Sequence, residues 1–290
     1  MDFATLIVAG IANGSLYALI ALGLVLLYKT QDLINFAYGE FFMFGAFAAY
    51  IALNWWDLPY WAAFLVAIAG VAAFGAVLER LAFRRLINET HLTLAMLTVG
   101  LSFAMKGAAR IPFGSDIYTF PPLFDGGPIR IGTAVIAPQA FATIAIAVAI
   151  TAGLFVFFAY NALGKQMRAT QQNPDGARLV GINISRVFVV TWGLSAGMGA
   201  AAGVIAAPSV LLYPDMGVGF LLKGFAAAVL GGLESIPGAI VGGFLVGIIE
   251  MLVGGFFTTA FQGVAPFFII MLVLFLKPDG LFGVKKLSRV

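Results

Sequence analysis

Long runs of apolar, nearly uncharged residues, each about twenty residues long, recur through this sequence from end to end. A helix needs about 20 such residues to cross the roughly 30 Å hydrocarbon core of a bilayer. Hydrophobic residues make up 62% of the 290 positions and charged residues 10%, against about 25% charged residues in a typical soluble domain. A soluble fold would lack the polar surface to cover such a core. The sequence therefore predicts an all-α, polytopic transmembrane helical bundle that forms one domain over residues 1–290.

The apolar runs divide into nine predicted spans, within an expected range of eight to ten. Continuous apolar runs exclude a transmembrane β-barrel, whose strands alternate apolar and polar residues. Glycines interrupt the runs between 187 and 257, so some of these helices are expected to be discontinuous. The predicted spans are 4–28, 33–53, 60–82, 91–110, 138–160, 187–207, 217–233, 238–257 and 264–277.

Basic residues set the predicted orientation, because lysine and arginine concentrate in cytoplasmic loops. Nine alternating spans place twelve of the sixteen basic residues on one side, which makes that side the cytoplasm. The N-terminus is then outside and the C-terminus inside. The twelve are Lys29, Arg80, Arg84, Arg85, Lys165, Arg168, Arg178, Arg186, Lys277, Lys285, Lys286 and Arg289.

Two connections are long enough to have a structure of their own. The outer loop 111–137 is rich in proline and glycine and is expected to form an ordered cap. The inner loop 161–186 is polar and basic, with helix-compatible sequence on both sides of Asn173-Pro174. Its regularly placed apolar residues argue against disorder. We expect it to form a short amphipathic helical hairpin at the cytoplasmic surface of the membrane.

Several kinds of chemistry are excluded by composition. The chain has no cysteine and one histidine, His91, so Cys- or His-clustered metal sites and Ser-His-Asp catalysis cannot be assembled within it. It also lacks the glycine-rich phosphate loop that ends in Gly-Lys-Ser/Thr. The net charge of +3 comes from loop ends and gives no sign of nucleic-acid binding. We expect a protein that is not an enzyme, with no catalytic residue, no metal and no cofactor of its own.

Ionisable side chains within predicted spans are costly in a bilayer and usually face a cavity or a partner. Glu40 lies about two turns into the span 33–53, and Glu250 lies in the span 238–257. Each could line a pathway or hold a neighbouring helix. Lys223 could pair with either carboxylate or extend to the interface. Asn13, early in the first span, could contact a polar solute or hold a neighbouring helix.

Glycine spacing in the second half of the chain mostly indicates close packing between helices. The segments 39–53 and 238–252 also look loosely alike, with glycine and bulky apolar residues in similar order. This similarity suggests an internal repeat.

Three stretches and the tail together resemble one family, the membrane permease subunits of high-affinity branched-chain amino acid ABC importers. They occur in the family's order and cover nearly the whole chain. The matching segments are GSLYALIALGL (14–24) with NFAYGE (35–40), GKQMRA (164–169) with Asn173, Ala177 and Gly181, KGFAAAVLGG (223–232) with the glycines up to 247 and Glu250, and KPDGLFG (277–283).

The resemblance implies a complex in the inner membrane of a bacterium. A second homologous permease subunit would pair with this chain, two cytoplasmic ATPase subunits would bind the ATP, and an external solute-binding protein would deliver the substrate. The loop 161–186 would then be the coupling element that docks on an ATPase. The residues matched for coupling are Gly164, Met167, Arg168, Asn173, Ala177 and Gly181.

The resemblance also implies import of branched-chain amino acids or of related small organic solutes. We expect the substrate pathway to be lined from Asn13, Asn35, Glu40 and Glu250 and to run beside the partner permease. Two alternatives stay open. One is a secondary transporter in which Glu40 or Glu250 carries a proton, and the other is a passive or purely structural membrane subunit. The amphipathic inner loop favours the importer, because a self-contained carrier needs no docking hairpin.

Overall fold

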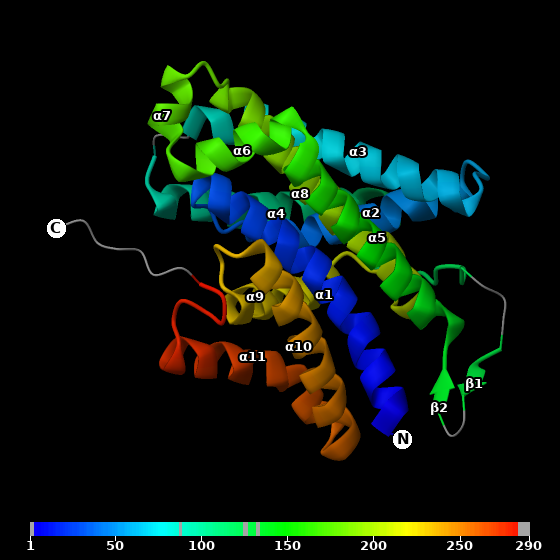
Figure 1. Cartoon of the computed structure of the whole chain (residues 1–290). Coiled ribbons are helices and arrows are strands. Elements are labelled where there is room, and N and C mark those ends of the chain that lie inside the picture. The colour runs from blue at the N-terminus through cyan, green and yellow to red at the C-terminus, as the bar shows by residue number, and fades with distance from the viewer. Residues whose placement is uncertain (1–2, 87–88, 124–126, 132–133, 284–290) are drawn as a thin grey trace.

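The computed structural model describes residues 3–86, 89–123, 127–131 and 134–283, and most of them are helical (Figure 1). Lys285, Lys286 and Arg289, which contributed to the predicted orientation, lie outside the described residues. Each of the nine predicted spans corresponds to a helix. These helices are α1 (Phe3–Gln31), α2 (Tyr38–Asn54), α3 (Tyr60–Leu81), α4 (His91–Phe113), α5 (Pro138–Tyr160), α8 (Ile184–Ala206), α9 (Gly217–Gly231), α10 (Ile236–Phe256) and α11 (Thr259–Leu276).

Shorter elements connect these helices. The predicted inner hairpin is formed by α6 (Ala162–Gln172) and α7 (Pro174–Leu179), and it is joined as expected at Asn173-Pro174. The loop predicted to lie outside contains a small antiparallel hairpin of β1 (Ile129–Ile131) and β2 (Ala134–Ile136). Two 3₁₀ turns, η1 (Phe83–Leu86) and η2 (Ala207–Ser209), follow α3 and α8.

Seven helices in the described chain are long and apolar enough to cross a membrane: α1, α3 (with η1), α4, α5, α8 (with η2), α10 and α11. The other two predicted spans became shorter helices, α2 with 17 residues and α9 with 15. The described chain is thus an all-α polytopic bundle of long helices that includes two short ones.

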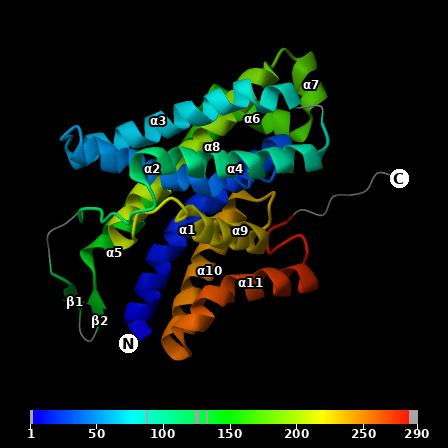
Figure 2. The same ribbon diagram turned by 180° about the vertical axis from the view of Figure 1, so that it is seen from behind.

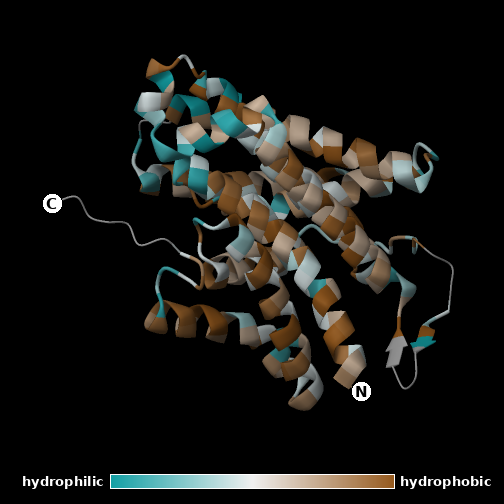
Figure 3. Ribbon diagram, viewed as in Figure 1, coloured by the Kyte–Doolittle hydropathy of each residue, from teal (hydrophilic) through white to brown (hydrophobic). Residues whose placement is uncertain are grey.

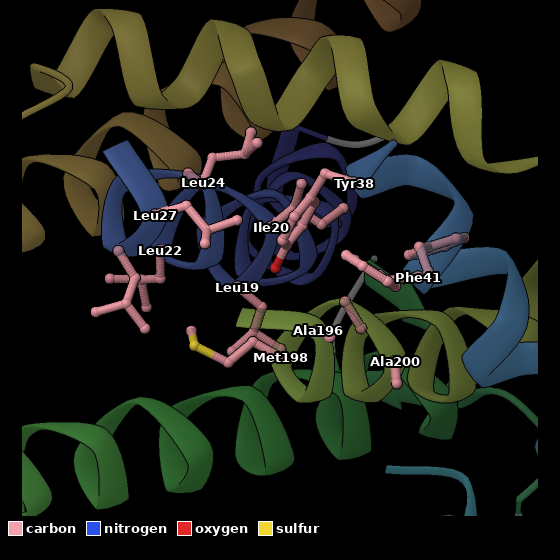
Figure 4. Close-up of a cluster of buried hydrophobic side chains, with 14 of the residues drawn as sticks. Leu19, Ile20, Leu22, Leu24, Leu27, Tyr38, Phe41, Ala196, Met198 and Ala200 are labelled. Atoms are coloured by element: carbon pink, nitrogen blue, oxygen red, sulfur yellow. The ribbon is translucent and has the colours of Figure 1, made fainter. Parts of the chain in front are cut away.

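The centre of the bundle is α1, which is buried along most of its length. Figure 4 shows side chains of α1, among them Leu19 and Ile20, in one buried cluster with Tyr38 and Phe41 of α2 and with Ala196, Met198 and Ala200 of α8. The Tyr38 hydroxyl donates a hydrogen bond to the Ser195 carbonyl at 2.9 Å, and the Ser195 hydroxyl donates to the Gly23 carbonyl at 2.8 Å. These bonds satisfy polar groups that would otherwise be buried unpaired and tie the three helices together.

The packing order of α1–α4 recurs in α8–α11. The most extensive helix contact joins α1 to α10, and its counterpart joins α8 to α3. In the same way α2 packs on α8 and α9 packs on α1. The first unit, α1–α4, begins with α1, whose C-terminal end lies beside the α6–α7 hairpin. The second unit, α8–α11, begins with α8, whose N-terminal end follows that hairpin. The two units are therefore inverted with respect to each other, an arrangement common in transport proteins.

The short helices α2 and α9 meet at their N-terminal ends. A Cβ atom at Gly39 or at Gly217 would overlap the backbone of the other glycine, so the two chains touch main chain to main chain. One turn further on, the rings of Phe42 and Phe220 stack with their centroids 4.4 Å apart. The suggested repeat of 39–53 with 238–252 would instead pair α2 with α10. The packing pairs α2 with α9, and Gly39-x-x-Phe42 with Gly217-x-x-Phe220 shows the same spacing.

One detail of the second predicted span is wrong. The sequence predicts Glu40 about two turns into a helix that begins at residue 33, but α2 begins at Tyr38 and Glu40 lies in its first turn. The chain stays non-helical before it because the Asn35 side chain accepts a hydrogen bond from the Ala37 amide, at 2.9 Å. The Phe36 amide donates to the Thr98 hydroxyl instead of to a helical carbonyl. Side chains here replace the helix's own hydrogen bonds.

Hydropathy differs sharply between the helices (Figure 3). The α6–α7 hairpin is the most hydrophilic region, whereas α3, α5 and α11 show long apolar stretches. The exposed large side chains of α11 include Phe267, Phe268, Met271 and Phe275. Such an apolar exterior fits a surrounding bilayer or a partner helix.

Candidate functional site: a polar stripe and an inner cavity

A stripe of polar residues runs along one face of α4. Thr98, Ser102, Lys106 and Arg110 follow one another at intervals of four residues, which puts them on one side of a helix. The flanking residues Met96, Val99 and Phe103 are exposed and apolar. Figure 2 shows α4 lying across the outside of α2. The stripe therefore turns toward the bundle while the apolar residues turn away from it.

The middle of the stripe meets the buried carboxylate of Glu40, which is 2% exposed. The Ser102 hydroxyl donates to Glu40 Oε1 at 2.8 Å, and Lys106 Nζ lies 3.5 Å from the same oxygen. Lys106 Nζ also lies 3.6 Å from Asp215, whose other oxygen is 2.6 Å from Arg110. Charges of alternating sign thus lead from the half-exposed Arg110 and Asp215 to the buried Glu40.

Asn35 lies next to the lower part of the stripe and is fully buried. Its side-chain carbonyl oxygen accepts a hydrogen bond from the Ala37 amide just before α2, and the amide of the following residue, Phe36, donates a hydrogen bond to the Thr98 hydroxyl. The Asn35 amide nitrogen and Glu40 Oε2 are buried without a hydrogen-bond partner within the described chain. Buried polar atoms of this kind call for a specific explanation. Both atoms belong to residues at or just before the start of α2, where its N-terminal end meets that of α9. The positive ends of the two helix dipoles come together there.

The other two predicted pathway residues belong to a different cluster. Glu250 on α10 is 2% exposed, accepts a hydrogen bond from the Tyr17 hydroxyl at 2.6 Å and is 2.7 Å from Lys223 Nζ. Lys223 therefore pairs with Glu250, one of the partners left open above. Asn13 donates a hydrogen bond to the nearby Met251 sulfur at 3.4 Å. This cluster joins α1, α9 and α10.

A cavity of about 770 Å³ lies at the end of the stripe, beneath the α6–α7 hairpin. Leu94, one further interval of four along α4, lines it. We call it the inner cavity, and its full lining is Tyr28, Lys29, Thr30, Gln31, Asp32, Phe83, Leu94, Thr170, Gln171, Gln172, Pro174, Phe188 and Glu234.

The predicted coupling residues divide by exposure. Gly164, Met167 and Ala177 are buried and pack the hairpin against the bundle. At Gly164 a Cβ atom would be 2.7 Å from the Phe158 Cα, so a side chain has no room there. The exposed members are Arg168, Asn173 and Gly181.

Local chemistry explains the turns of the hairpin. Asn173 caps α7 by accepting a hydrogen bond from the Gly176 amide at 2.9 Å, as N-terminal asparagines commonly do. Gly181 has a φ of 84°, which favours glycine. Just before it, the apolar side chains of Leu179 and Val180 are 89% and 76% exposed. They form an apolar tip, defined as Leu179 and Val180, on an otherwise hydrophilic hairpin.

Sequence reasoning missed the α4 stripe and Asp215. The spacing of 98, 102, 106 and 110 within an apolar span was a readable signal, because polar residues at intervals of four share a helix face. Asp215 carries no such signal, since it lies in the loop after α8. Among the described residues, no group of three or more His, Asp and Glu side chains gathers to hold a metal ion.

A buried polar stripe inside an inverted repeat of apolar helices defines the class of this molecule, a polytopic membrane transport protein. Comparison with known families gives a narrower assignment. Residues 6–276 match the family model described as the branched-chain amino acid transport system permease component. The chain belongs to this family of membrane permease components, which is not a family of enzymes.

Individual relatives match over almost their whole length. The chain is 32% identical to the high-affinity branched-chain amino acid transport system permease protein LivH of Escherichia coli, covering 97% of this chain and 96% of LivH. It is 32% identical to the corresponding permease protein BraD of Pseudomonas aeruginosa, over 98% and 97% of the two chains. A probable LivH of Methanocaldococcus jannaschii is 27% identical over 97% of this chain and 93% of that one.

Proposed function

We propose that this chain is the permease subunit of an ABC importer that carries branched-chain or closely related amino acids into the cytoplasm. Family membership supports the permease role, and the printed function of LivH and BraD supports the substrate class. Two ATPase subunits bind and hydrolyse the ATP, a second homologous permease completes the membrane part, and an external solute-binding protein delivers the solute. The complex lies in a bacterial inner membrane with the N-terminus outside and the C-terminus in the cytoplasm.

The observation that carries the proposed pathway is the α4 stripe. It offers polar groups at successive turns from the outer residues Arg110 and Asp215, past Glu40, to Thr98 and the inner cavity. Polar groups inside a membrane protein usually mark the route of a polar solute. We place Glu40 and Asn35 on this route, because the Asn35 amide nitrogen and Glu40 Oε2 are buried without a hydrogen-bond partner in the described chain and would suit the two charged groups of an amino acid when the route opens.

Asn13 and Glu250 take a different role in this proposal. Glu250 is already held by Tyr17 and Lys223, and Asn13 lies beside the same helix contact. We therefore assign this cluster as a brace that holds α1, α9 and α10 together. The proton-coupled alternative gains no support from the fold or from the family.

The α6–α7 hairpin is the proposed coupling element. Its apolar tip, Leu179 and Val180, and the exposed Arg168 are positioned to contact an ATPase subunit. Buried Met167 and Ala177 would transmit a push from this contact into the bundle, because tightly packed elements move as rigid bodies.

The proposal is tested by co-purifying the subunits that bind this chain and reconstituting them in vesicles with the solute-binding protein. ATP-dependent uptake of labelled leucine is then measured. Ser102→Phe, which fills the stripe, should lower uptake at least tenfold while the complex still assembles. Met271→Phe, at an exposed position of α11, is the matched control and should import normally.

Two results would contradict the proposal. A chain that brings down no ATPase subunit, or that imports leucine without ATP, is not the subunit of an ABC importer. Equal uptake by the Ser102→Phe and Met271→Phe variants would move the pathway away from α4.

A further inference from the structure

The inner cavity has the chemistry of a site for a free amino acid. Lys29 supplies a positive charge, Asp32 and Glu234 supply negative charges, and Phe83, Leu94 and Phe188 form an apolar part. A branched aliphatic amino acid has the same three features: a carboxylate, an ammonium group and an apolar side chain. The volume of about 770 Å³ lies within the range of about 300–1,000 Å³ found for small-molecule pockets.

Two amide groups strengthen the positive end of this cavity. The Gln31 carbonyl oxygen accepts a hydrogen bond from the Trp192 indole at 3.1 Å, which orients the amide and leaves its NH₂ group as a donor. The amide nitrogens of Gln31 and Gln171 are both buried without a hydrogen-bond partner in the described part of the chain. Both glutamines line the cavity beside Lys29, so a rotation of their side chains would turn N–H donors from α1 and α6 toward a bound carboxylate, and bonds to a charged group are the stronger kind.

The walls of the cavity belong to parts of the molecule with different proposed tasks. Lys29, Gln31 and Asp32 lie at the end of α1, and Leu94 lies on α4 at the end of the stripe. Thr170, Gln171 and Gln172 lie on α6, in the coupling hairpin. A second cavity of about 360 Å³ shares Lys29, Gln171 and Glu234 with the first, so these residues stand between the two. A ligand bound to Lys29 and Gln171 would connect α1 directly to the hairpin.

We propose that the inner cavity binds the transported amino acid from the cytoplasmic side and that its occupancy slows ATP hydrolysis by the complex. This inference rests on the proposed function, because it takes α6–α7 as the coupling element. A ligand that holds α6 against α1 favours the conformation in which it is bound, and the hairpin then moves less readily during the ATPase cycle. The importer would thus slow as its product accumulates.

The test uses the complete complex in vesicles without the solute-binding protein. Only complexes whose ATPase subunits face the bath can hydrolyse added ATP, so leucine in the bath reaches their cytoplasmic side. Leucine should lower the ATPase rate in a saturable way. Isocaproate, which lacks the ammonium group, and isopentylamine, which lacks the carboxylate, should each need at least about tenfold higher concentration, since each loses a charge-assisted contact.

Variants connect the inhibition to this cavity. Lys29→Gln and Gln171→Leu should each raise the half-inhibiting leucine concentration about tenfold. Arg85→Gln removes one positive charge from an exposed position close to the cavity-lining Phe83 and should leave the inhibition as in the wild type. ATP hydrolysis in the absence of leucine shows that each variant complex is folded.

Three outcomes would overturn the inference. Leucine has no effect on the wild-type ATPase rate, or it inhibits all three variants equally, or the two leucine analogues act as strongly as leucine. In each case ATP-dependent import can remain intact, so the proposed function would survive. If the proposed function is wrong, no ATPase subunit co-purifies with the chain. That result would also rule out this inference.

Discussion

The ammonium group of Lys106 lies 3.5 Å from the Glu40 carboxylate and so joins two helices that pack against each other over only a small area. Lys106 is itself largely shielded, with a side chain 15% exposed, and Glu40 is almost completely buried. The pair therefore does two things at once. It neutralises a charge inside the bundle, and it holds α4 with its polar stripe turned inward.

This pair leads to a prediction about stability. Lys106→Met should destabilise the protein by about 3 kcal/mol, because it leaves the Glu40 carboxylate buried without a positive charge beside it, held only by the Ser102 hydroxyl. That corresponds to a drop in Tm of roughly 10 °C, measurable by fluorescence-detected thermal unfolding in detergent. Adding Glu40→Gln should restore much of the stability but not leucine uptake. A double variant that imports normally would show that neither charge belongs to the pathway.

The second buried pair predicts an asymmetry. Lys223→Met leaves Glu250 buried with only the Tyr17 hydrogen bond, whereas Glu250→Gln leaves Lys223, whose side chain is 25% exposed, able to reach a more polar surrounding. Lys223→Met should therefore lower Tm more than Glu250→Gln does. If Glu250 only braces the helices, Glu250→Gln keeps leucine uptake. Loss of uptake with an unchanged Tm would return Glu250 to the pathway.

The contact between the ends of α2 and α9 predicts a strong effect of one methyl group. Gly39→Ala would place a Cβ atom against the Gly217 backbone and should cost about 1–3 kcal/mol. Gly70→Ala is the matched control, because nothing lies within 4 Å of a Cβ atom there. The control should be neutral or stabilising by up to about 1 kcal/mol. Equal thermal stability of the two variants would contradict this close approach.

The apolar tip of the hairpin predicts where the ATPase subunit binds. Leu179→Asp should reduce the amount of ATPase subunit that co-purifies with the chain at least tenfold, because a charge replaces an apolar contact. Leu281→Asp changes another exposed leucine, 42% exposed, and should leave the yield of complex unchanged. Normal co-purification of the Leu179→Asp variant would place the docking surface elsewhere on the hairpin.

The α4 stripe shows how far a local pattern reaches. Its spacing of four is visible in the sequence and identifies a face of the helix. The pattern does not say what lies opposite, and the structure supplies Glu40 from α2 and Asp215 from the loop after α8. Lys223 is a similar case. From the sequence, either Glu40 or Glu250 could be its ion-pair partner, and in the packed structure the partner is Glu250.

The start of α2 also depends on a contact that the local sequence does not reveal. Residues 33–37 have the apolar character of a span. The side chains of Asn35 and Thr98 nevertheless accept hydrogen bonds from the backbone amides of Ala37 and Phe36, so α2 begins only at Tyr38. The acceptor for the Phe36 amide comes from a different helix. No pattern within residues 33–53 could have predicted it.

The sequence by itself determined the membrane bundle, the position of nine helices and the hairpin around Asn173-Pro174, because hydropathy, helix length and turn chemistry depend on neighbouring residues. It also carried enough family pattern to assign the permease class. Only the tertiary structure decided that α2 and α9 meet end to end, which lysine neutralises which glutamate, and that the stripe ends in a cavity beneath the hairpin. These features depend on contacts between residues far apart in the chain, which form only when the helices pack.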